Sequence, residues 1–295
     1  MSSRRQPVRA KSPNDPGRRT GRQYHIGLAP GEVAPTILLV GDPARARRIA
    51  ARLEGPGPEA CHREYVSISG RRHGRPLSVM ATGIGCDNTE IAVVELCRIV
   101  ERPTFLRVGT CGALQPRVDV GHLCLSTGAL RLESTSLAYV EPGYPALAHH
   151  EVLLATLVAA QAWAAGGRGR RWHAGITATA PGFYGAQGRD DDPRFPSRFP
   201  GRVDRLRRQG VLNMEMEMST LFTLASLGGA RAGGLCVVYA NRAEGRFATE
   251  AQQPAFQEAA IEVALRATDV LAAMDEARGR GAFWAPAELL AAAWG

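Results

Sequence analysis

Short apolar runs alternate with longer amphipathic segments along most of the chain. The runs at 36–40 (TILLV), 104–108 (TFLRV) and 234–240 (GLCVVYA) are mostly apolar and are flanked by proline, glycine or polar residues. Such runs are typical of strands buried on both faces of a parallel sheet. This alternation predicts an α/β fold, a single domain with a central, mostly parallel mixed sheet flanked by helices. Further strands are predicted at 76–81, 122–127, 175–180 and 212–215, and helices at 44–53, 88–101, 150–165, 200–209, 217–228 and 253–277.

Most of the positive charge lies at the N-terminus. Residues 1–23 hold seven basic residues and one acidic residue, whereas the whole chain has a formal net charge of +8. The segment is rich in Ser, Pro and Gly, which predicts a disordered basic tail before a domain over 24–278 and an appendage over 279–295. Such a tail can bind nucleic acid or another polyanion. Because Lys11 is the only lysine in the chain, a solvated extension in an arginine-rich protein is the simpler interpretation, and nucleic acid is not an expected partner.

Several protein classes do not fit this composition. No apolar run reaches the roughly 18 residues of a membrane span, and the N-terminus lacks the apolar core of a signal peptide. The six cysteines show no CxxC pair and no Cys/His ligand spacing, so we expect reduced thiols in a cytoplasmic protein. The Walker A lysine and the third glycine of a dinucleotide fingerprint after Gly83-Ile84-Gly85 are both absent from the sequence.

The first candidate subsite binds an anion. Gly41 to Arg45 (GDPAR) follows a predicted strand and opens a predicted helix, where N–H groups and Arg45 can meet an oxyanion. An ordinary turn with a solvated arginine gives the same pattern. Arg107 lies within an apolar strand, where an unpaired charge costs on the order of several kcal/mol, so we expect an anion at its tip. The following Gly-Thr-Cys-Gly predicts a turn that presents Thr110. Arg63 is ambiguous, because adjacent Arg and Glu residues commonly form surface pairs.

The second candidate subsite binds a sugar. Glu215, Met216 and Glu217 stand where a short apolar run meets a predicted helix. An ionised carboxylate only accepts hydrogen bonds and therefore suits the hydroxyls of a ribose. Two other interpretations fit the same residues: acidic side chains at a helix N-terminus, or a strand edge on which methionines alternate with glutamates.

The third candidate subsite binds a planar base. The segment 181–189 (PGFYGAQGR) offers Phe183 for stacking and places Gln187 and Arg189 beyond it. The edge of a pyrimidine needs an acceptor and donors, which glutamine and arginine supply together. A flexible polar surface loop is the alternative.

Taken in order, these stretches resemble the nucleoside phosphorylase superfamily, and most closely the bacterial uridine phosphorylases. The resemblance covers about residues 24–275 and is carried by YHIGL, GDPAR, HREY, TGIG, FLRVGTCGALQP, RLESTSL, FYGAQGR, NMEMEMSTL and VVYANR. It implies a nucleoside phosphorylase-like domain that converts uridine and phosphate into uracil and ribose 1-phosphate, a step of pyrimidine salvage. It also implies phosphate as co-substrate, no required cofactor, and a hexamer built as a trimer of dimers.

The resemblance also implies a role for each candidate residue. Phosphate is held by Gly41, Arg45, Arg107 and Thr110, with Arg63 from a neighbouring subunit. Ribose is held by Glu217 and Met216, with Glu215 nearby and His25 reaching across from the partner. Uracil meets Phe183, Gln187 and Arg189, and the catalytic residues are Arg107, Thr110, Gln187 and Arg189. A potassium site between subunits matches Glu64, Ile84 and Asn88.

Three positions depart from the family pattern. Cys111 stands where a second threonine is usual, and Asn88 replaces the serine of the cation site. Tyr239-Ala240 replaces a pair of smaller aliphatic residues near the base, which changes the shape of the pocket.

The sequence is also compatible with other functions. Purine-specific relatives place an aspartate where this chain has Asn241-Arg242, with no carboxylate before Glu244, and this favours a pyrimidine. A nucleosidase of the same fold lacks a phosphate clamp, whereas three candidate phosphate arginines are retained here. A nucleoside sensor, or a polyanion binder that uses the basic tail, is the non-enzymatic alternative.

Overall fold

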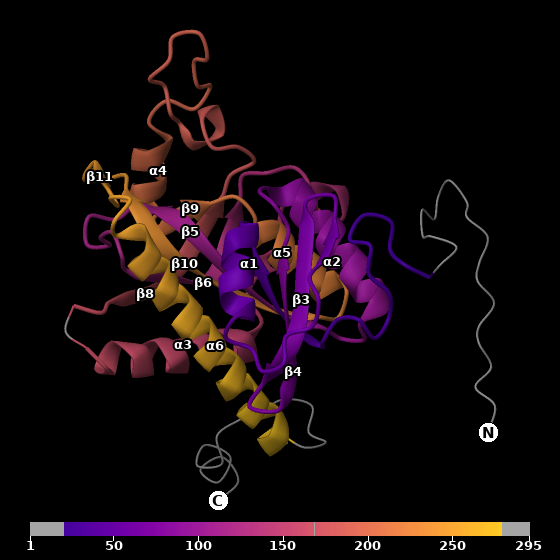
Figure 1. Cartoon of the computed structure of the whole chain (residues 1–295). Helices are drawn as coiled ribbons and strands as arrows, with labels where there is room; N and C mark the ends of the chain where they lie inside the picture. The colour runs from indigo at the N-terminus through magenta and orange to yellow at the C-terminus, as the bar shows by residue number, and fades with distance from the viewer. Residues whose placement is uncertain (1–20, 168, 279–295) are drawn as a thin grey trace, which may run out of the picture.

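One sheet of eleven strands runs through residues 21–167 and 169–278, the part of the chain that the computed structural model describes (Figure 1). The strands are β1 (Thr36–Val40), β2 (Ala60–His62), β3 (Tyr65–Arg72), β4 (Arg75–Ala81), β5 (Thr104–Ala113), β6 (Leu123–Arg131), β7 (Ala146–Leu147), β8 (Trp172–Thr179), β9 (Asn213–Glu215), β10 (Arg231–Asn241) and β11 (Arg246–Phe247). The helices are α1 (Pro43–Ala50), α2 (Cys86–Ile99), α3 (His150–Ala165), α4 (Arg202–Arg208), α5 (Met218–Leu227) and α6 (Gln253–Arg278), with 3₁₀ turns η1 (Ser136–Ala138) and η2 (Gly185–Gln187).

The sheet combines parallel pairs with antiparallel ones. Strands β4, β1, β5 and β10 pair in parallel, as do β6, β8 and β9. Antiparallel pairs join β10 to β6 and β9 to β5. Because β10 also pairs with β5, strands β5, β10, β6, β8 and β9 close into a ring. The hairpins of β2, β3 and β4 and the short strands β7 and β11 add further antiparallel pairs. The predicted α/β fold with a mixed sheet is confirmed.

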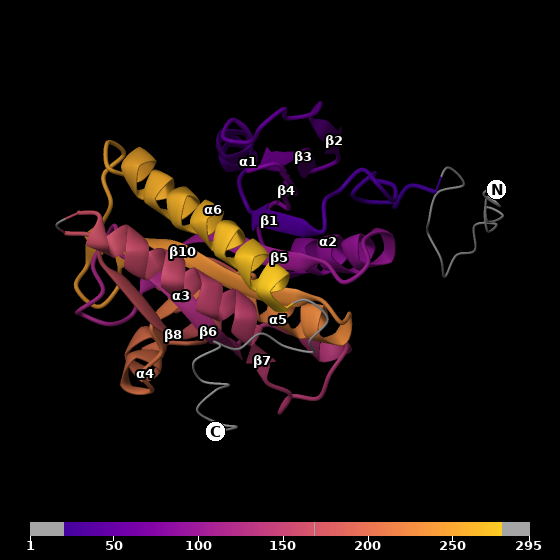
Figure 2. The same ribbon diagram turned by 90° about the horizontal axis from the view of Figure 1, so that it is seen from below.

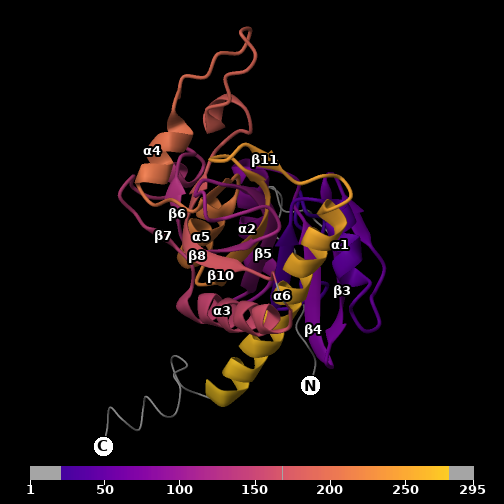
Figure 3. The ribbon, with the colours of Figure 1, turned by 90° about the vertical axis from the view of Figure 1, so that its left-hand side faces the viewer.

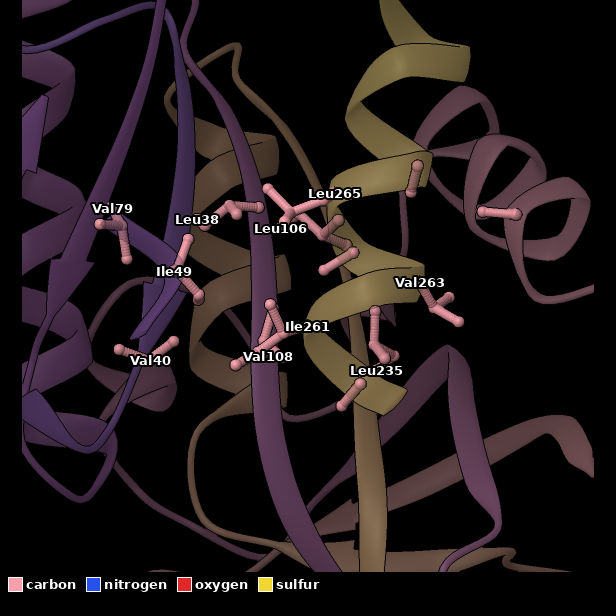
Figure 4. Packing of buried hydrophobic residues seen from close by; sticks show 14 of the residues in the cluster. Leu38, Val40, Ile49, Val79, Leu106, Val108, Leu235, Ile261, Val263 and Leu265 are labelled. Carbon is pink, nitrogen blue, oxygen red and sulfur yellow. The ribbon is translucent and has the colours of Figure 1, made fainter. Parts of the chain in front are cut away.

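Helices cover both faces of the sheet. Helices α3 and α6 lie side by side on one face (Figures 2 and 3), and α1 packs on the same side. Leu106 and Val108 of β5 point to that side, where they meet Ile261 and Leu265 of α6 (Figure 4). The alternate β5 residues face α2 and α5. Arg107, between Leu106 and Val108, therefore points to the side of α2 and α5, because successive strand residues face opposite ways.

The predicted turn at Gly-Thr-Cys-Gly is wrong. Residues 109–113 continue β5 and pair with β10, and the last two also pair with β9. The two glycines of this stretch serve packing instead. A Cβ on Gly109 would lie 3.0 Å from the sulfur of Cys236 and 3.3 Å from Nη2 of Arg107. A Cβ on Gly112 would lie 3.3 Å from the side chain of Arg242.

The predicted tail and appendage lie almost wholly outside the described residues. At the start of the described chain, Arg22 pairs with Glu32 and the N–H of Gln23 donates to the carbonyl of Leu28, so ordered contacts include the last residues assigned to the tail. Within the described chain, every helix is too short or too polar to cross a bilayer. All six cysteines are free thiols.

Candidate functional site

A cavity of about 990 Å³ opens at the carboxyl ends of β1, β4, β9 and β10 and along the last residues of β5. The loop between β8 and α4 projects beyond the same edge (Figure 1). The cavity brings together most of the residues that the sequence singled out. They are Gly41, Arg45, Arg63, Glu64, Ile84, Arg107, Thr110, Phe183, Gln187, Arg189, Glu215, Met216 and Glu217.

Arg107 finds its anion within the protein. Its guanidinium pairs with the carboxylate of Glu217 and, at 3.4 Å, with that of Glu215, and all three side chains are buried. Although burial disfavours the charged form, the two carboxylates raise the pKa of Arg107 above its ordinary value. The sequence correctly predicted an anion at the tip of this arginine. The sequence did not indicate that two carboxylates of the protein itself, Glu215 and Glu217, would supply the negative charge next to Arg107.

Glu215 is held on all sides by donors from the chain. Its carboxylate accepts hydrogen bonds from Thr179 Oγ1 at 2.6 Å and from the N–H groups of Glu217 and Met218 at 2.8 and 2.9 Å. Burial and the nearby Glu217 raise the pKa of Glu215 above that of an ordinary carboxyl group. Because its oxygens are engaged, Glu215 fixes the segment before α5 and orients Arg107.

Glu217 is held by Arg107 on one side and by the backbone of Gly85 on the other. Its Oε1 accepts a hydrogen bond from the N–H of Gly85 at 2.7 Å, while Oε2 faces Arg107. Gly85 precedes the first residue of α2 and has a φ of 103°, which a residue with a Cβ rarely adopts. The TGIG stretch, which resembled half of a nucleotide fingerprint, thus supplies a main-chain donor to Glu217, a residue of the expected sugar subsite. Its Gly-x-Gly pattern was the only signal in the sequence.

The positive charge of Arg45 is compensated much less than that of Arg107, because Arg45 contacts a carbonyl where Arg107 contacts two carboxylates. It lies on the first turn of α1, is 7% exposed, and donates from Nη1 to the carbonyl of Val108 at 3.1 Å. Burial and the positive charge of Arg107 both lower the pKa of Arg45. Arg45 contacts the carbonyl of Val108, and Arg107 Nη2 would lie 3.3 Å from a Cβ on the next residue, Gly109, so both guanidinium groups face the same part of the cavity. A small anion between them stabilises both charges.

The start of α1 adds to this anion subsite. Asp42 caps the helix by accepting a hydrogen bond from the N–H of Ala44 at 2.8 Å, and Pro43 occupies the first turn. A Cβ on Gly41 would lie 3.2 Å from the carbonyl oxygen of Gly83, so glycine lets the β1–α1 and β4–α2 loops approach each other. Thr110, partly exposed to the cavity, lies on β5 beside them.

The base subsite is built around Gln187. Its Oε1 accepts from Arg189 at 2.7 Å, and its carbonyl accepts from Arg242 at 3.0 Å. Arg189 also donates to the carbonyl of Phe183, and its guanidinium carbon lies 3.8 Å from the centre of the Phe183 ring. The guanidinium therefore covers one face of the ring that was expected to stack on a base. Burial and the charge of Arg242 lower the pKa of Arg189 to about 10. The sequence did not assign Arg242 to the site; its position at the end of β10 was the available signal.

Of the two residues expected from a partner subunit, Arg63 lines the cavity of its own chain and His25 does not. Arg63 is exposed at the cavity, has a φ of 55° and lies over the ring of Tyr24. His25 is not among the residues that line the cavity; its ring pairs with Glu95 at 2.8 Å. The chain therefore carries His25 away from its own site.

The residues of the expected cation site lie close to one another. A Cβ on Gly83 would lie 2.8 Å from Asn88 Nδ2 and 3.7 Å from Glu64 Cγ, and Ile84 follows directly. A carboxylate, an amide oxygen and a backbone carbonyl form an oxygen donor set, which fits a hard cation. Glu64 and Ile84 are both exposed.

Comparison with known proteins finds a matching family model and several similar proteins. The family model of the phosphorylase superfamily matches residues 35–274. A uridine phosphorylase of Thermococcus kodakarensis is 44% identical over 261 residues, which cover 88% of this chain and 90% of that protein. A uridine phosphorylase of Escherichia coli is 37% identical over 225 residues, covering 75% and 87%. A guanosine phosphorylase of Halorubrum lacusprofundi is 35% identical over 225 residues, covering 76% and 86%. Relatives named for a pyrimidine and for a purine nucleoside thus both fall within this range of similarity.

Proposed function

Since this chain belongs to the phosphorylase superfamily, we propose that it catalyses the phosphorolysis of uridine to uracil and ribose 1-phosphate. The observation that carries the proposal is that two buried guanidinium groups, Arg45 and Arg107, line one cavity that also holds Glu217. A hydrolase needs no such pair of charges, because water carries none. Phosphate supplies the anion that both arginines can share.

In the proposed reaction phosphate is both nucleophile and counter-charge. Arg45 and Arg107 hold it beneath C1′, with Thr110 as a further hydrogen-bonding group. The bond from C1′ to the base breaks and its electron pair moves onto uracil, while a phosphate oxygen forms the new bond to C1′. Positive charge that develops on the ribose lies next to the phosphate. Holding the two reactants in this geometry supplies about 7 to 11 kcal/mol in favourable cases.

Glu217 and Met216 make the sugar subsite of this proposal. Glu217 accepts hydrogen bonds from ribose hydroxyls with the lone pairs that Gly85 and Arg107 leave open. Since Arg107 contacts both Glu217 and the phosphate, it sets the distance between sugar and nucleophile. Glu215 positions this arginine and does not need to touch the substrate.

At the base, Gln187 and Arg189 bind uracil by its edge and stabilise the negative charge that arrives on its oxygens. Asn241 supports a pyrimidine over a purine. Its amide donates to the carbonyl of Val118 at 2.9 Å and its Oδ1 accepts from the N–H groups of Ala243 and Glu244 at 2.9 Å. The side chain is thus committed to the backbone and offers no acid to a purine nitrogen. Guanosine phosphorolysis is the second candidate, because one relative carries that name.

The proposal extends to assembly. We infer a hexamer built as a trimer of dimers, in which His25 and Arg63 of one subunit complete the site of its neighbour. The separation of His25 from its own cavity supports this arrangement. Glu64, Ile84 and Asn88 would hold a potassium ion at the same junction, where it would fix the orientation of Arg63 through Glu64.

A single assay tests the proposal. Purified protein is incubated with uridine, thymidine, cytidine, inosine, adenosine or guanosine, with and without phosphate, and the sugar product is identified. We expect ribose 1-phosphate from uridine only when phosphate is added. Faster cleavage of inosine or guanosine than of uridine would assign the enzyme to purines, and free ribose as product would make it a hydrolase.

A further inference from the structure

Tyr239 was expected near the base, but its hydroxyl contacts α6 and, through Gln257, reaches α1, the helix that carries Arg45. The reaction described above gives it no role. It stands on β10 where the pairing with β5 shifts register between Val238 and Ala240. Its side chain lines the cavity and packs against the hydrophobic cluster shared by α1 and α6. Its hydroxyl accepts a hydrogen bond from Gln257 Nε2 at 2.7 Å and donates to the carbonyl of Gln253 at 3.4 Å. Both partners lie on the first turns of α6.

The contacts continue from α6 to α1. Gln257 uses its other amide atom, Oε1, to accept a hydrogen bond from Arg48 Nη1 at 3.4 Å. An ion pair between Arg52 and Glu258 joins the same two segments. Since Gln257 has donors and acceptors on opposite sides of one planar amide, the hydroxyl of Tyr239 fixes which side faces Arg48. The orientation of this amide is therefore set from β10.

Arg48 lies one turn after Arg45 on the same short helix. Arg45 itself is 7% exposed and donates to the carbonyl of Val108 on β5. A shift of α1 relative to α6 moves Arg45 relative to Arg107, because Arg107 is anchored separately by Glu215 and Glu217.

We propose that Tyr239 is a positioning residue for phosphate: through Gln257 and Arg48 it fixes the helix that carries Arg45. This inference rests on the proposed function. The effect should be selective for phosphate, because Tyr239 is linked to Arg45, which has no carboxylate partner like those that hold Arg107. The sugar subsite is held by a different set of contacts, and the base subsite by another.

The test compares Tyr239→Phe, Gln257→Ala and the double variant in the full chain, with phosphate and uridine varied in turn. Tyr239→Phe keeps the ring and removes one hydroxyl. We expect it to raise the KM for phosphate about fivefold, the effect of one hydrogen bond. The KM for uridine and the kcat at saturating phosphate should stay within about twofold of wild type. Gln257→Ala should act the same way, and the double variant should be no worse than the more affected single variant, because the two residues act as one unit.

The matched control is Tyr144→Phe. This tyrosine also loses a hydroxyl hydrogen bond, 3.0 Å to Ser226 Oγ, but it does not line the cavity, so all three kinetic constants should be unchanged. An unchanged KM for phosphate in Tyr239→Phe overturns the inference, as does a parallel change in both KM values, kcat and thermal stability, which indicates a merely structural role. Multiplied effects in the double variant also overturn it, because they make the two residues independent. If wild-type turnover needs no phosphate, the proposed function fails first and this inference with it.

Discussion

Arg107 and Glu217, which are 110 positions apart in the chain, form a buried ion pair in the cavity, where the proposed anion and sugar subsites meet. Arg107 comes from the middle of a strand and Glu217 from the residue before α5. The pair explains why an arginine is tolerated within an apolar strand. It also couples the two subsites, because movement of one partner displaces the other.

Replacing Glu217 by Gln should therefore impair catalysis more than folding. The amide can still accept from Gly85, but it loses the charge that holds Arg107 and the ribose hydroxyls. We expect kcat/KM for uridine to fall about a hundredfold, the size of effect seen when a reacting group is misplaced by about 1 Å. Steady-state kinetics with Glu101→Gln, an exposed carboxylate before β5, as the control will measure it. A fall below threefold would remove Glu217 from the sugar subsite.

Arg189 should act on the leaving base. Replacing it by Ala removes the charge that stabilises the departing uracil, and we expect kcat for uridine to fall by a factor of about 10²–10³. With 5-fluorouridine, whose base leaves more easily, the loss should be smaller. Arg194→Ala serves as control, since this arginine lies in the same loop and pairs with Asp192 on the exposed surface. Equal losses for both nucleosides would contradict a role in leaving-group stabilisation.

Gly109 should not tolerate a side chain. A Cβ at this position would crowd the sulfur of Cys236 and the guanidinium of Arg107, so Gly109→Ala should lower the free energy of unfolding by about 1 to 3 kcal/mol and also reduce activity. Gly143→Ala, where a Cβ meets nothing within 4 Å, is the matched control. Chemical denaturation will compare them, and equal stability of the two variants would refute the packing role of this glycine.

His149 should make the protein sensitive to mild acid. Its ring caps α3 by accepting from the N–H of Glu151 at 3.3 Å. Burial and the charge of His150 lower the pKa of His149 to about 4. Because the unfolded chain takes up this proton near pH 6.5, the contribution of His149 to stability is present above pH 6.5 and is lost as the pH falls towards 4.

The substitution His149→Asn tests this directly. Asparagine retains a helix-capping oxygen but does not titrate. Melting temperatures of the variant and the wild type should therefore be compared from pH 7.5 to 4.5. We expect wild type to lose more stability than the variant across this range. Parallel curves would show that another group controls the acid response.

The sequence predicted the framework well where a single pattern dominates. The strand at 36–40 and the helix at 150–165 match β1 and α3 at both ends. The hairpin of β3 was missed because YVSISGRR mixes serines with apolar residues and ends in arginines. The turn predicted after Val108 was wrong because glycine occurs both where the backbone bends and where neighbouring atoms pack closely. Only the neighbouring strands show that close packing applies here.

The site could be predicted as a set of residues but not as a set of contacts. Gly41, Arg45, Arg107, Gln187 and Glu217 were singled out correctly as neighbours of one cavity. The pairing of Arg107 with Glu217 and the cover of Phe183 by Arg189 depend on side-chain orientations that strand order alone does not fix.

The phosphate dependence of uridine cleavage in wild type and in Arg45→Ala tests the central claim most directly. If Arg45 and Arg107 hold one phosphate beneath C1′, wild type should form ribose 1-phosphate and be inactive without phosphate. Removal of Arg45 should then raise the KM for phosphate at least about tenfold, the effect of a lost charged hydrogen bond, with little change in the KM for uridine. Phosphate-independent release of free ribose, or an Arg45→Ala variant with wild-type phosphate kinetics, would contradict it.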